Sequence, residues 1–300
     1  MERVRYKLTV AYDGTEFFGW QKQEPPVEGG AGDVVDGERE MGRVVRDGVE
    51  RAQLRTVQHV LEQAVRETLR EEVVVNGASR TDSGVHAWGQ VASFLSVPDA
   101  SKGVGWPGER GCGALVKAVN ARLPRDVLVR SAEVVPEDFN PIGGAVSKEY
   151  TYTIACGEAR PVFGRRYVWH TWYDLDVEKM NEAAKVLIGE HDFAGFAQIN
   201  HGRKTTVRTI FTCGVEELDA SSDVVGIGGD KVKLVRVRVS GSGFLYNMVR
   251  IVAGTLMEVG RGKMSVDEVR AVVEEADRLK NRGMTLPPMG LRLEWIRYGE

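Results

Sequence analysis

Apolar and polar residues alternate along the chain in short runs of period two, and longer runs with helical spacing interrupt them. The period-two runs predict strands over residues 4–12, 72–78, 90–97, 126–135, 148–155, 167–172, 206–215, 231–240 and from 287 onward. The helical runs predict helices over 56–69, 114–123, 177–188 and 265–279, and an apolar helix that ends near 260. Because many strands follow one another directly, the pattern favours an α+β fold with mainly antiparallel sheets over a doubly wound parallel sheet.

The length of 300 residues suits one large domain or two ordinary ones. The strand and helix pattern restarts after residue 143, which indicates two similar domains, 1–143 and 144–300. Between residues 24 and 53 the periodicity is lost, and glycines, two adjacent prolines and many charges take its place. These features predict a long, flexible, acidic insertion at about 24–55.

The net charge of −3 first argues against a nucleic-acid partner, but the acidic residues are concentrated in two segments. Residues 24–50 hold eight acids and three arginines, and residues 214–230 hold five acids and no base. The rest of the chain has 30 acids (43 minus 13) and 37 bases (40 minus 3). This balance permits a polyanion-binding site, since affinity depends on local charge.

The cysteine spacing and the hydropathy of the chain indicate in which cellular compartment the protein is expected. The three cysteines lie far apart and form no C-x-x-C pair, so neither a disulfide framework nor a zinc site is expected. No apolar run is long enough to cross a bilayer, and the first residues lack the apolar core of a signal peptide. A cytoplasmic protein without a membrane partner is therefore expected.

The segment "GASRTDSGVHAWGQVASF", residues 77–94, holds the densest group of reactive side chains. Its Ser79 suggests a nucleophile elbow, but that motif needs a glycine where Thr81 stands. The run Asp82-Ser83-Gly84 suggests an aspartic protease, but no second Asp-Ser/Thr-Gly supplies the partner carboxylate. Arg80 would also keep Asp82 ionised, against a shared-proton mechanism.

A third interpretation is a single carboxylate that acts beside an arginine on a nucleotide. Arg80 can bind phosphate or fill the gap left by an extruded base. Asp82 can attack or deprotonate the sugar while the glycosidic bond breaks, without a metal or redox cofactor. Taken alone, "TDSG" is better explained as a β-turn, in which Asp, Ser and Gly are all favoured.

The surrounding blocks resemble those of TruA-type tRNA pseudouridine synthases. The segment 77–94 is similar to their active-site pattern, Gly-Arg-Thr-Asp-Ala-Gly-Val-His with a later Gly-Gln-Val. Further blocks follow in order: "AYDGTEFFGWQKQ", "TVQHVLEQAV", "VNARLPRDV", "FNPIGGAVSKEYTYTI", "LIGEHDFAGF", "RKTTVRTI", "GSGFLYNMVRIVAGTLMEVG" and "PPMGLRLEWI". The resemblance extends through most of the chain, and it implies the pseudouridine synthase fold with an active-site cleft between two α+β domains.

The resemblance also assigns individual residues. It implies that Asp82 is the catalytic aspartate and that Arg80 assists base flipping or contacts the RNA backbone. Tyr150 would pack against the target base, although strand packing alone would explain it. Arg250 would pair with the carboxylate and keep it ionised, and an arginine in so apolar a helix already suggests an acidic partner. Leu245 would line the apolar wall of the pocket.

Other polar residues have weaker assignments. The family does not use His86 in catalysis, so a structural role is expected. Three basic residues could contact tRNA phosphates or form a solvated face: Arg203, Lys204 and Arg208.

The implied reaction converts uridine to pseudouridine at positions 38, 39 and 40 of the tRNA anticodon stem-loop. The resemblance implies a homodimer with tRNA bound across both subunits, and no cofactor. An RNA-binding or chaperone protein on the same fold is the rival hypothesis, and the complete set of Arg80, Asp82, Tyr150 and Arg250 argues against it. The chain departs from the pattern at Ser79, where glycine is usual, at Ser83, where alanine is usual, and in the insertion at 24–55.

Overall fold

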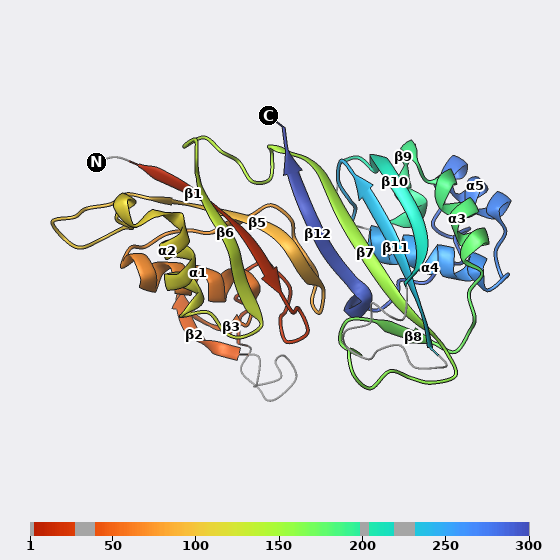
Figure 1. The fold of residues 1–300 in the computed structure, drawn as a ribbon, viewed down its shortest axis with the longest axis horizontal. Helices are drawn as coiled ribbons and strands as arrows, with labels where there is room; N and C mark the ends of the chain where they lie inside the picture. Colours follow the sequence, from red (N-terminus) through yellow and green to blue (C-terminus); the bar gives the residue numbers. More distant parts are fainter. Residues whose placement is uncertain (1–2, 28–39, 199–203, 219–231, 300) are drawn as a thin grey trace. The chain divides into compact units, whose positions relative to one another are not determined.

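A computed structural model describes residues 3–27, 40–198, 204–218 and 232–299 of the chain (Figure 1). The chain divides into two compact units, Met1–Ala145 and Val146–Tyr298, close to the boundary that the sequence indicates. Strands and helices are mixed in both units, and the strand pairs with a described register are antiparallel, except for one parallel pair in the second unit. The α+β class expected from the sequence is confirmed.

The first unit is built on a three-stranded core sheet. Its strand order is β6–β1–β5, and the short β4 pairs with β5. Strand β1 alternates as the sequence predicts, and it buries Tyr6, Leu8 and Val10. Helix α2 packs against β6 and α1, so the apolar faces of the helices and the sheet share one core. The elements are β1 (Val4–Tyr12), α1 (Val57–Leu69), β4 (Asn76–Gly77), β5 (His86–Ser96), α2 (Gly111–Asn120) and β6 (Val127–Val135).

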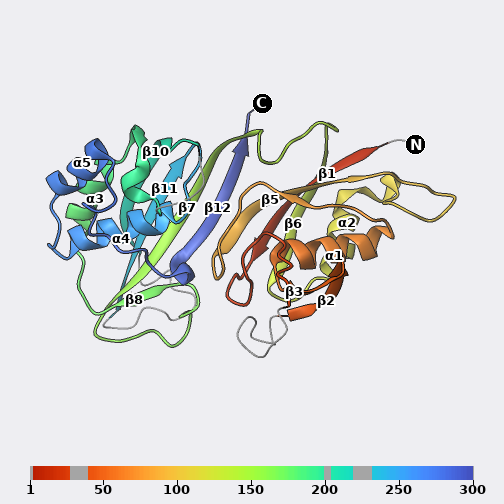
Figure 2. The ribbon, with the colours of Figure 1, turned by 180° about the vertical axis from the view of Figure 1, so that it is seen from behind.

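The second unit has a sheet of strand order β12–β7–β11–β10–β9, and β8 pairs in parallel with β7. Figures 1 and 2, seen from opposite sides, show its three helices together on one side of the sheet. The elements are β7 (Ala145–Gly157), β8 (Trp169–Thr171), α3 (Val177–Val186), β9 (Gly189–Asp192), β10 (Val207–Leu218), β11 (Val232–Gly241), α4 (Met248–Gly260), α5 (Val266–Glu275) and β12 (Leu291–Tyr298).

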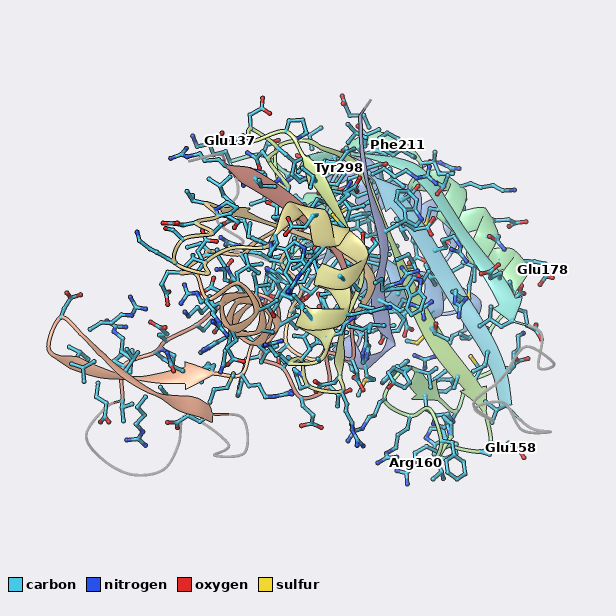
Figure 3. All side chains as sticks on the ribbon, turned by 60° about the vertical axis from the view of Figure 1, so that its left-hand side comes forward. Glu137, Glu158, Arg160, Glu178, Phe211 and Tyr298 are labelled. Atoms are coloured by element: carbon cyan, nitrogen blue, oxygen red, sulfur yellow. The ribbon has the colours of Figure 1, made fainter. Side chains whose placement is uncertain are left out.

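The prediction of a flexible insertion is wrong for residues 40–54. These residues form an antiparallel hairpin of β2 (Glu40–Arg46) and β3 (Val49–Leu54). Asp47 and Gly48 both have positive φ, at 51° and 76°, as a two-residue hairpin turn requires. The Asp-Gly pair between Arg46 and Val49 is the sequence signal for this turn. The many charged residues around it made the segment read as irregular. Figure 3 shows the hairpin extending away from the helices of its unit; residues 28–39 lie outside the described part.

The predicted strand over 72–78 is wrong for residues 72–75, because only Asn76 and Gly77 pair with β5. Side chains of α1 bind the backbone of this segment instead. Gln58 donates to the Val75 carbonyl at 2.8 Å, and the Glu62 carboxylate accepts from the Val75 amide at 3.1 Å. The backbone hydrogen bonds of a strand are therefore replaced by side-chain bonds to a helix. Among the described residues, no helix is long and apolar enough to cross a membrane.

Candidate active site

The loop that carries Asp82 is fixed at its start by Gln90. This fully buried side chain on β5 accepts from the Ser79 amide at 3.1 Å and donates to the Ser79 carbonyl at 2.6 Å. Ser79 is not among the residues with positive φ. The serine at this position therefore causes no left-handed backbone strain, although the family pattern has glycine there.

Thr81 fixes the middle of the loop to the segment of residues 12–20. Its hydroxyl lies 2.7 Å from the Tyr12 hydroxyl, and its carbonyl accepts from the Trp20 amide at 3.0 Å. Gly19 has φ 88°, and a Cβ there would lie 2.6 Å from the Thr81 carbonyl oxygen. Only glycine allows this close approach, so the block around residues 12–20 and the Asp82 loop are built as one piece.

Asp82 begins a tight turn, as its neighbours suggested. The Val85 amide donates to the Asp82 carbonyl at 3.1 Å, and Gly84 supplies φ 78°. The Ser83 hydroxyl donates to the Phe17 carbonyl at 3.1 Å. Thr81 is buried, whereas Asp82 is half-buried and Arg80 is exposed. The loop therefore carries the Arg80 guanidinium and the Asp82 carboxylate on a backbone that hydrogen bonds hold in place.

His86 has structural contacts at the start of β5. Its side chain is 3% exposed, and Nδ1 accepts from the Gly14 amide at 3.0 Å. The same nitrogen lies 3.2 Å from Asp13 Oδ1. His86 thus joins the segment around Asp13 and Gly14 to the start of β5.

Gln90→Met tests how strongly this network fixes the loop. The change keeps the volume but leaves the Ser79 amide and carbonyl without their side-chain partners, at a cost of about 1–3 kcal/mol for each group that stays desolvated. We expect a lower unfolding midpoint in urea and slower catalytic turnover. Wild-type stability and turnover in Gln90→Met would contradict the positioning role.

In the second unit, Tyr150 lies on β7 opposite Val239 of β11. Its side chain is 7% exposed, and its ring meets Phe244 edge to face, with centroids 5.2 Å apart. Leu245, the next residue after Phe244, is 4% exposed. The structure therefore connects Tyr150 to the segment that leads into α4, which is the segment that contains Leu245.

Arg250 lies in the first turn of α4 and is half-buried. Its Nε donates to the Leu286 carbonyl at 2.6 Å, and Nη1 donates to Asn247 Oδ1 at 2.7 Å. Asn247, the N-cap of α4, has φ 61° and also donates to Gln198 Oε1 at 2.5 Å. The guanidinium is therefore held by two acceptors from different segments, which fixes its plane.

Two of the three candidate phosphate contacts, Lys204 and Arg208, lie in the described part of the chain. Arg203 lies outside the described residues. Lys204 is exposed, and Arg208 on β10 is half-buried. Arg208 Nη1 donates to the carbonyls of Thr205 at 3.1 Å and Val207 at 2.5 Å, so part of its guanidinium is already engaged locally.

The structure thus places Arg80 and Asp82 in one loop of the first unit, and Tyr150, Leu245 and Arg250 in the second. Sequence reasoning missed the residues that hold these groups, chiefly Tyr12, Gln90 and Asn247. A signal existed for Gln90, because a glutamine inside an apolar strand needs hydrogen-bond partners when buried.

Two of the three cysteine thiols are buried and are not activated as nucleophiles. Burial raises the pKa of Cys156 and of Cys213 to about 12, so both thiols stay protonated at neutral pH. In the described ranges, no three His, Cys, Asp or Glu side chains come together as a metal-binding group.

Comparison with known proteins reveals close relatives. The family profile described as tRNA pseudouridine synthase matches residues 8–142 and 183–299. The chain is 38% identical over 292 residues to tRNA pseudouridine synthase A 2 of Clostridium perfringens, covering 97% of this chain and 98% of that protein. It is 38% identical over 298 residues to tRNA pseudouridine synthase A of Bacillus subtilis, covering 98% and 99%. The enzyme of that name from Citrifermentans bemidjiense is 38% identical over 294 residues, covering 98% and 97%.

Proposed function

The chain belongs to the tRNA pseudouridine synthase family, and we propose that it isomerises uridine at positions 38, 39 and 40 of the tRNA anticodon stem-loop, with Asp82 as the catalytic carboxylate. The observation that supports Asp82 most directly is the way its loop is built. Gln90, Tyr12 and Trp20 bind the backbone or side chains on the N-terminal side of the acid. Such preorganisation is what a group must have when it acts on a sugar carbon.

In the proposed reaction, the N1–C1′ bond of uridine breaks and the uracil leaves with the bonding electrons. Asp82 assists either by attacking C1′ or by removing the proton on C2′. The uracil then turns, and C5 bonds to C1′ as the Asp82 ester bond breaks or, in the second route, as the proton returns to C2′. The proton on C5 is released, and N1 takes up a proton. The C1′ carbon exchanges a nitrogen for a carbon, so the product has the same atoms as the substrate and no redox partner is required.

The other site residues bind the substrate in this proposal. Arg80 is exposed beside Asp82, where it can bind phosphate or replace the extruded base. Tyr150 and Leu245 offer aromatic and apolar surface to the uracil, from the domain 144–300. Arg250 supplies a fixed positive charge. Lys204, Arg203 and Arg208 contact the RNA backbone.

One assay tests this function. The protein is incubated with tRNA that carries tritium at uridine C5, and released label is measured together with the position of pseudouridine. We expect release that reports modification at positions 38–40 and fails with tRNA that lacks uridine there. Tight tRNA binding without release from any anticodon-stem substrate would instead favour the RNA-binding or chaperone hypothesis.

Deletion of residues 28–50 should leave modification largely intact. The Val27 amide donates to the Glu50 carbonyl at 2.8 Å, and Pro26 forms a bridge with Arg51, so the two ends of the deletion already lie together. A short Gly-Ser turn can therefore join Val27 to Arg51 while Ala52 and Leu54 stay in the core. We expect tritium release within about twofold of the full chain, and complete loss in a folded variant would show that the insertion takes part in the reaction.

We also propose that the enzyme acts in the cytoplasm as a homodimer that binds tRNA across both subunits. Support comes from the family resemblance. Sedimentation equilibrium with and without tRNA tests the dimer, and a mass of one chain at micromolar concentration would contradict it.

A further inference from the structure

The segment from Gly157 to Tyr173, which links β7 to β8 and continues past it, combines aromatic and arginine side chains. It contains a single carboxylate, on Glu158. Four of its aromatic side chains retain large exposed fractions: 72% for Phe163, 46% for Tyr167, 66% for Trp172 and 52% for Tyr173. Neighbouring exposed aromatic side chains are typical of a surface that a partner covers.

The exposure does not come from a loosely attached backbone. Val168 is buried with Ala155 and Leu234 in a small apolar core. Strand β8 pairs with β7, with Ile154 opposite Trp169. The Tyr167 amide donates to the Gly164 carbonyl at 2.8 Å, which closes a turn. The buried Val168 and the pairing of β8 with β7 thus anchor the segment, while its large aromatic side chains are exposed to solvent.

Two of the aromatic rings have fixed orientations. The Trp172 ring meets the His170 ring edge to face with centroids 4.5 Å apart, and His170 Nε2 lies 3.0 Å from the Gly157 carbonyl oxygen. The guanidinium of Arg261, at the end of α4, lies 3.7 Å from the centre of the Tyr173 ring. Rings that are already oriented lose little conformational entropy when a planar group stacks on them.

The charges of the segment favour an anionic partner. Arg160, Arg165 and Arg166 are all exposed. Arg165 Nη1 donates to the Val162 carbonyl at 3.2 Å, which restricts the position of its guanidinium. Figure 3 shows Glu158 where β7 ends and Arg160 in the loop that follows. A guanidinium can bind phosphate through two parallel hydrogen bonds.

Exposed aromatic rings next to exposed arginines in the sequence favour some classes of partner over others. An apolar protein surface would cover the rings, but it offers no anionic group to the exposed guanidinium groups of Arg160 and Arg165. Double-stranded RNA offers phosphates but keeps its bases stacked inside the helix. Unpaired RNA offers both phosphates and free base faces, and each base–aromatic stack contributes substantially to affinity.

We propose that residues 157–173 form a second RNA-binding surface, here named the basic–aromatic segment, which binds unpaired nucleotides of the tRNA substrate. Phe163, Tyr167 and Trp172 stack on bases, and Arg160, Arg165 and Arg166 bind the adjoining phosphates. The proposal rests on the proposed function, because the RNA is the substrate of that reaction. It adds a surface that none of the residues assigned to the chemistry supplies.

Two double variants test the stacking and phosphate roles separately. Fluorescence anisotropy measures the binding of a tRNA transcript over a range of salt concentrations, and oligouridine serves as a single-stranded competitor. Phe163→Ala with Trp172→Ala should weaken tRNA binding by about thirtyfold or more without changing the salt dependence. Arg165→Gln with Arg166→Gln should lower the slope of log K against log salt by about 1.4. Tritium release at saturating tRNA should match the wild type in both variants.

Matched controls remove similar groups from other elements of the same unit. Phe211→Ala removes a side chain of 48% exposure from β10, and Arg270→Gln removes an exposed arginine from α5. Both should bind tRNA normally. Wild-type affinity and salt dependence in both double variants would overturn the proposal, as would a change in sedimentation with unaltered RNA binding, which would assign the segment to a protein contact. Wild-type protein that binds tRNA through this segment but releases no tritium would contradict the proposed function and still support the RNA-binding surface.

Discussion

Asp82→Asn should reduce tritium release from C5-labelled tRNA by about 10²–10⁴-fold or more, the range typical for removal of a group that transfers a proton or attacks in the transition state. Asparagine has the same shape but can neither attack C1′ nor accept the 2′ proton as a base. The loop backbone is held at Ser79, at Thr81 and at the Asp82 carbonyl, and the isosteric side chain disturbs none of these bonds, so we expect the loop to survive the change. Single-turnover release at saturating tRNA isolates this effect from binding.

Two measurements make the Asp82 result specific. The affinity of Asp82→Asn for tRNA should stay within about tenfold of the wild type, or roughly 1.4 kcal/mol. Ser83→Ala is the matched control, since it removes a neighbouring polar group and its bond to the Phe17 carbonyl while keeping the carboxylate. We expect near-normal turnover from Ser83→Ala. Substantial turnover in Asp82→Asn would show that another group performs the chemistry.

Local periodicity predicted those elements whose apolar faces pack on the core. Strand β1 has the predicted bounds, because its alternating residues are buried and its pairing is regular until residue 9. Helix α1 begins after Thr56, whose hydroxyl accepts from the His59 amide at 3.3 Å, as an N-cap does. The same logic failed at residues 72–75, where burial alternates as in a strand. There the backbone bonds go to the side chains of Gln58, Glu62 and Arg66 of α1.

The chemistry-bearing residues were easier to predict than the residues that hold them. Asp82 and Arg80 lie in one short motif, so sequence adjacency alone brings them together. The bonds that fix the loop join residues far apart in the chain: Gln90 binds Ser79 across 11 positions, and Tyr12 meets Thr81 across 69. Whether two such distant side chains meet depends on strand register, which periodicity cannot give. Asn247 is a similar case, because its left-handed backbone follows from the start of α4.

Arg250→Lys should lower single-turnover tritium release about a hundredfold although the positive charge is kept. Arg250 uses two nitrogens of one rigid plane to reach the Leu286 carbonyl and Asn247 Oδ1. A lysine ammonium on a flexible stem cannot serve both acceptors in that arrangement, so its charge loses its fixed position. The acceptor left without a donor should also cost about 1–3 kcal/mol of stability, which urea unfolding would detect.

The comparison with Arg250→Met separates position from charge. If Arg250 only contributes charge, the lysine variant should release tritium like the wild type and the methionine variant should not. If the plane of the guanidinium matters, both variants should fall together, and the lysine variant should still bind tRNA with wild-type salt dependence because its charge is retained. Arg270→Lys on α5 is the matched control, since Arg270 is exposed and bonds only its helical neighbour Asp267 among the contacts described. Wild-type turnover in Arg250→Lys would therefore contradict a positioning role for the guanidinium and leave electrostatics as its contribution.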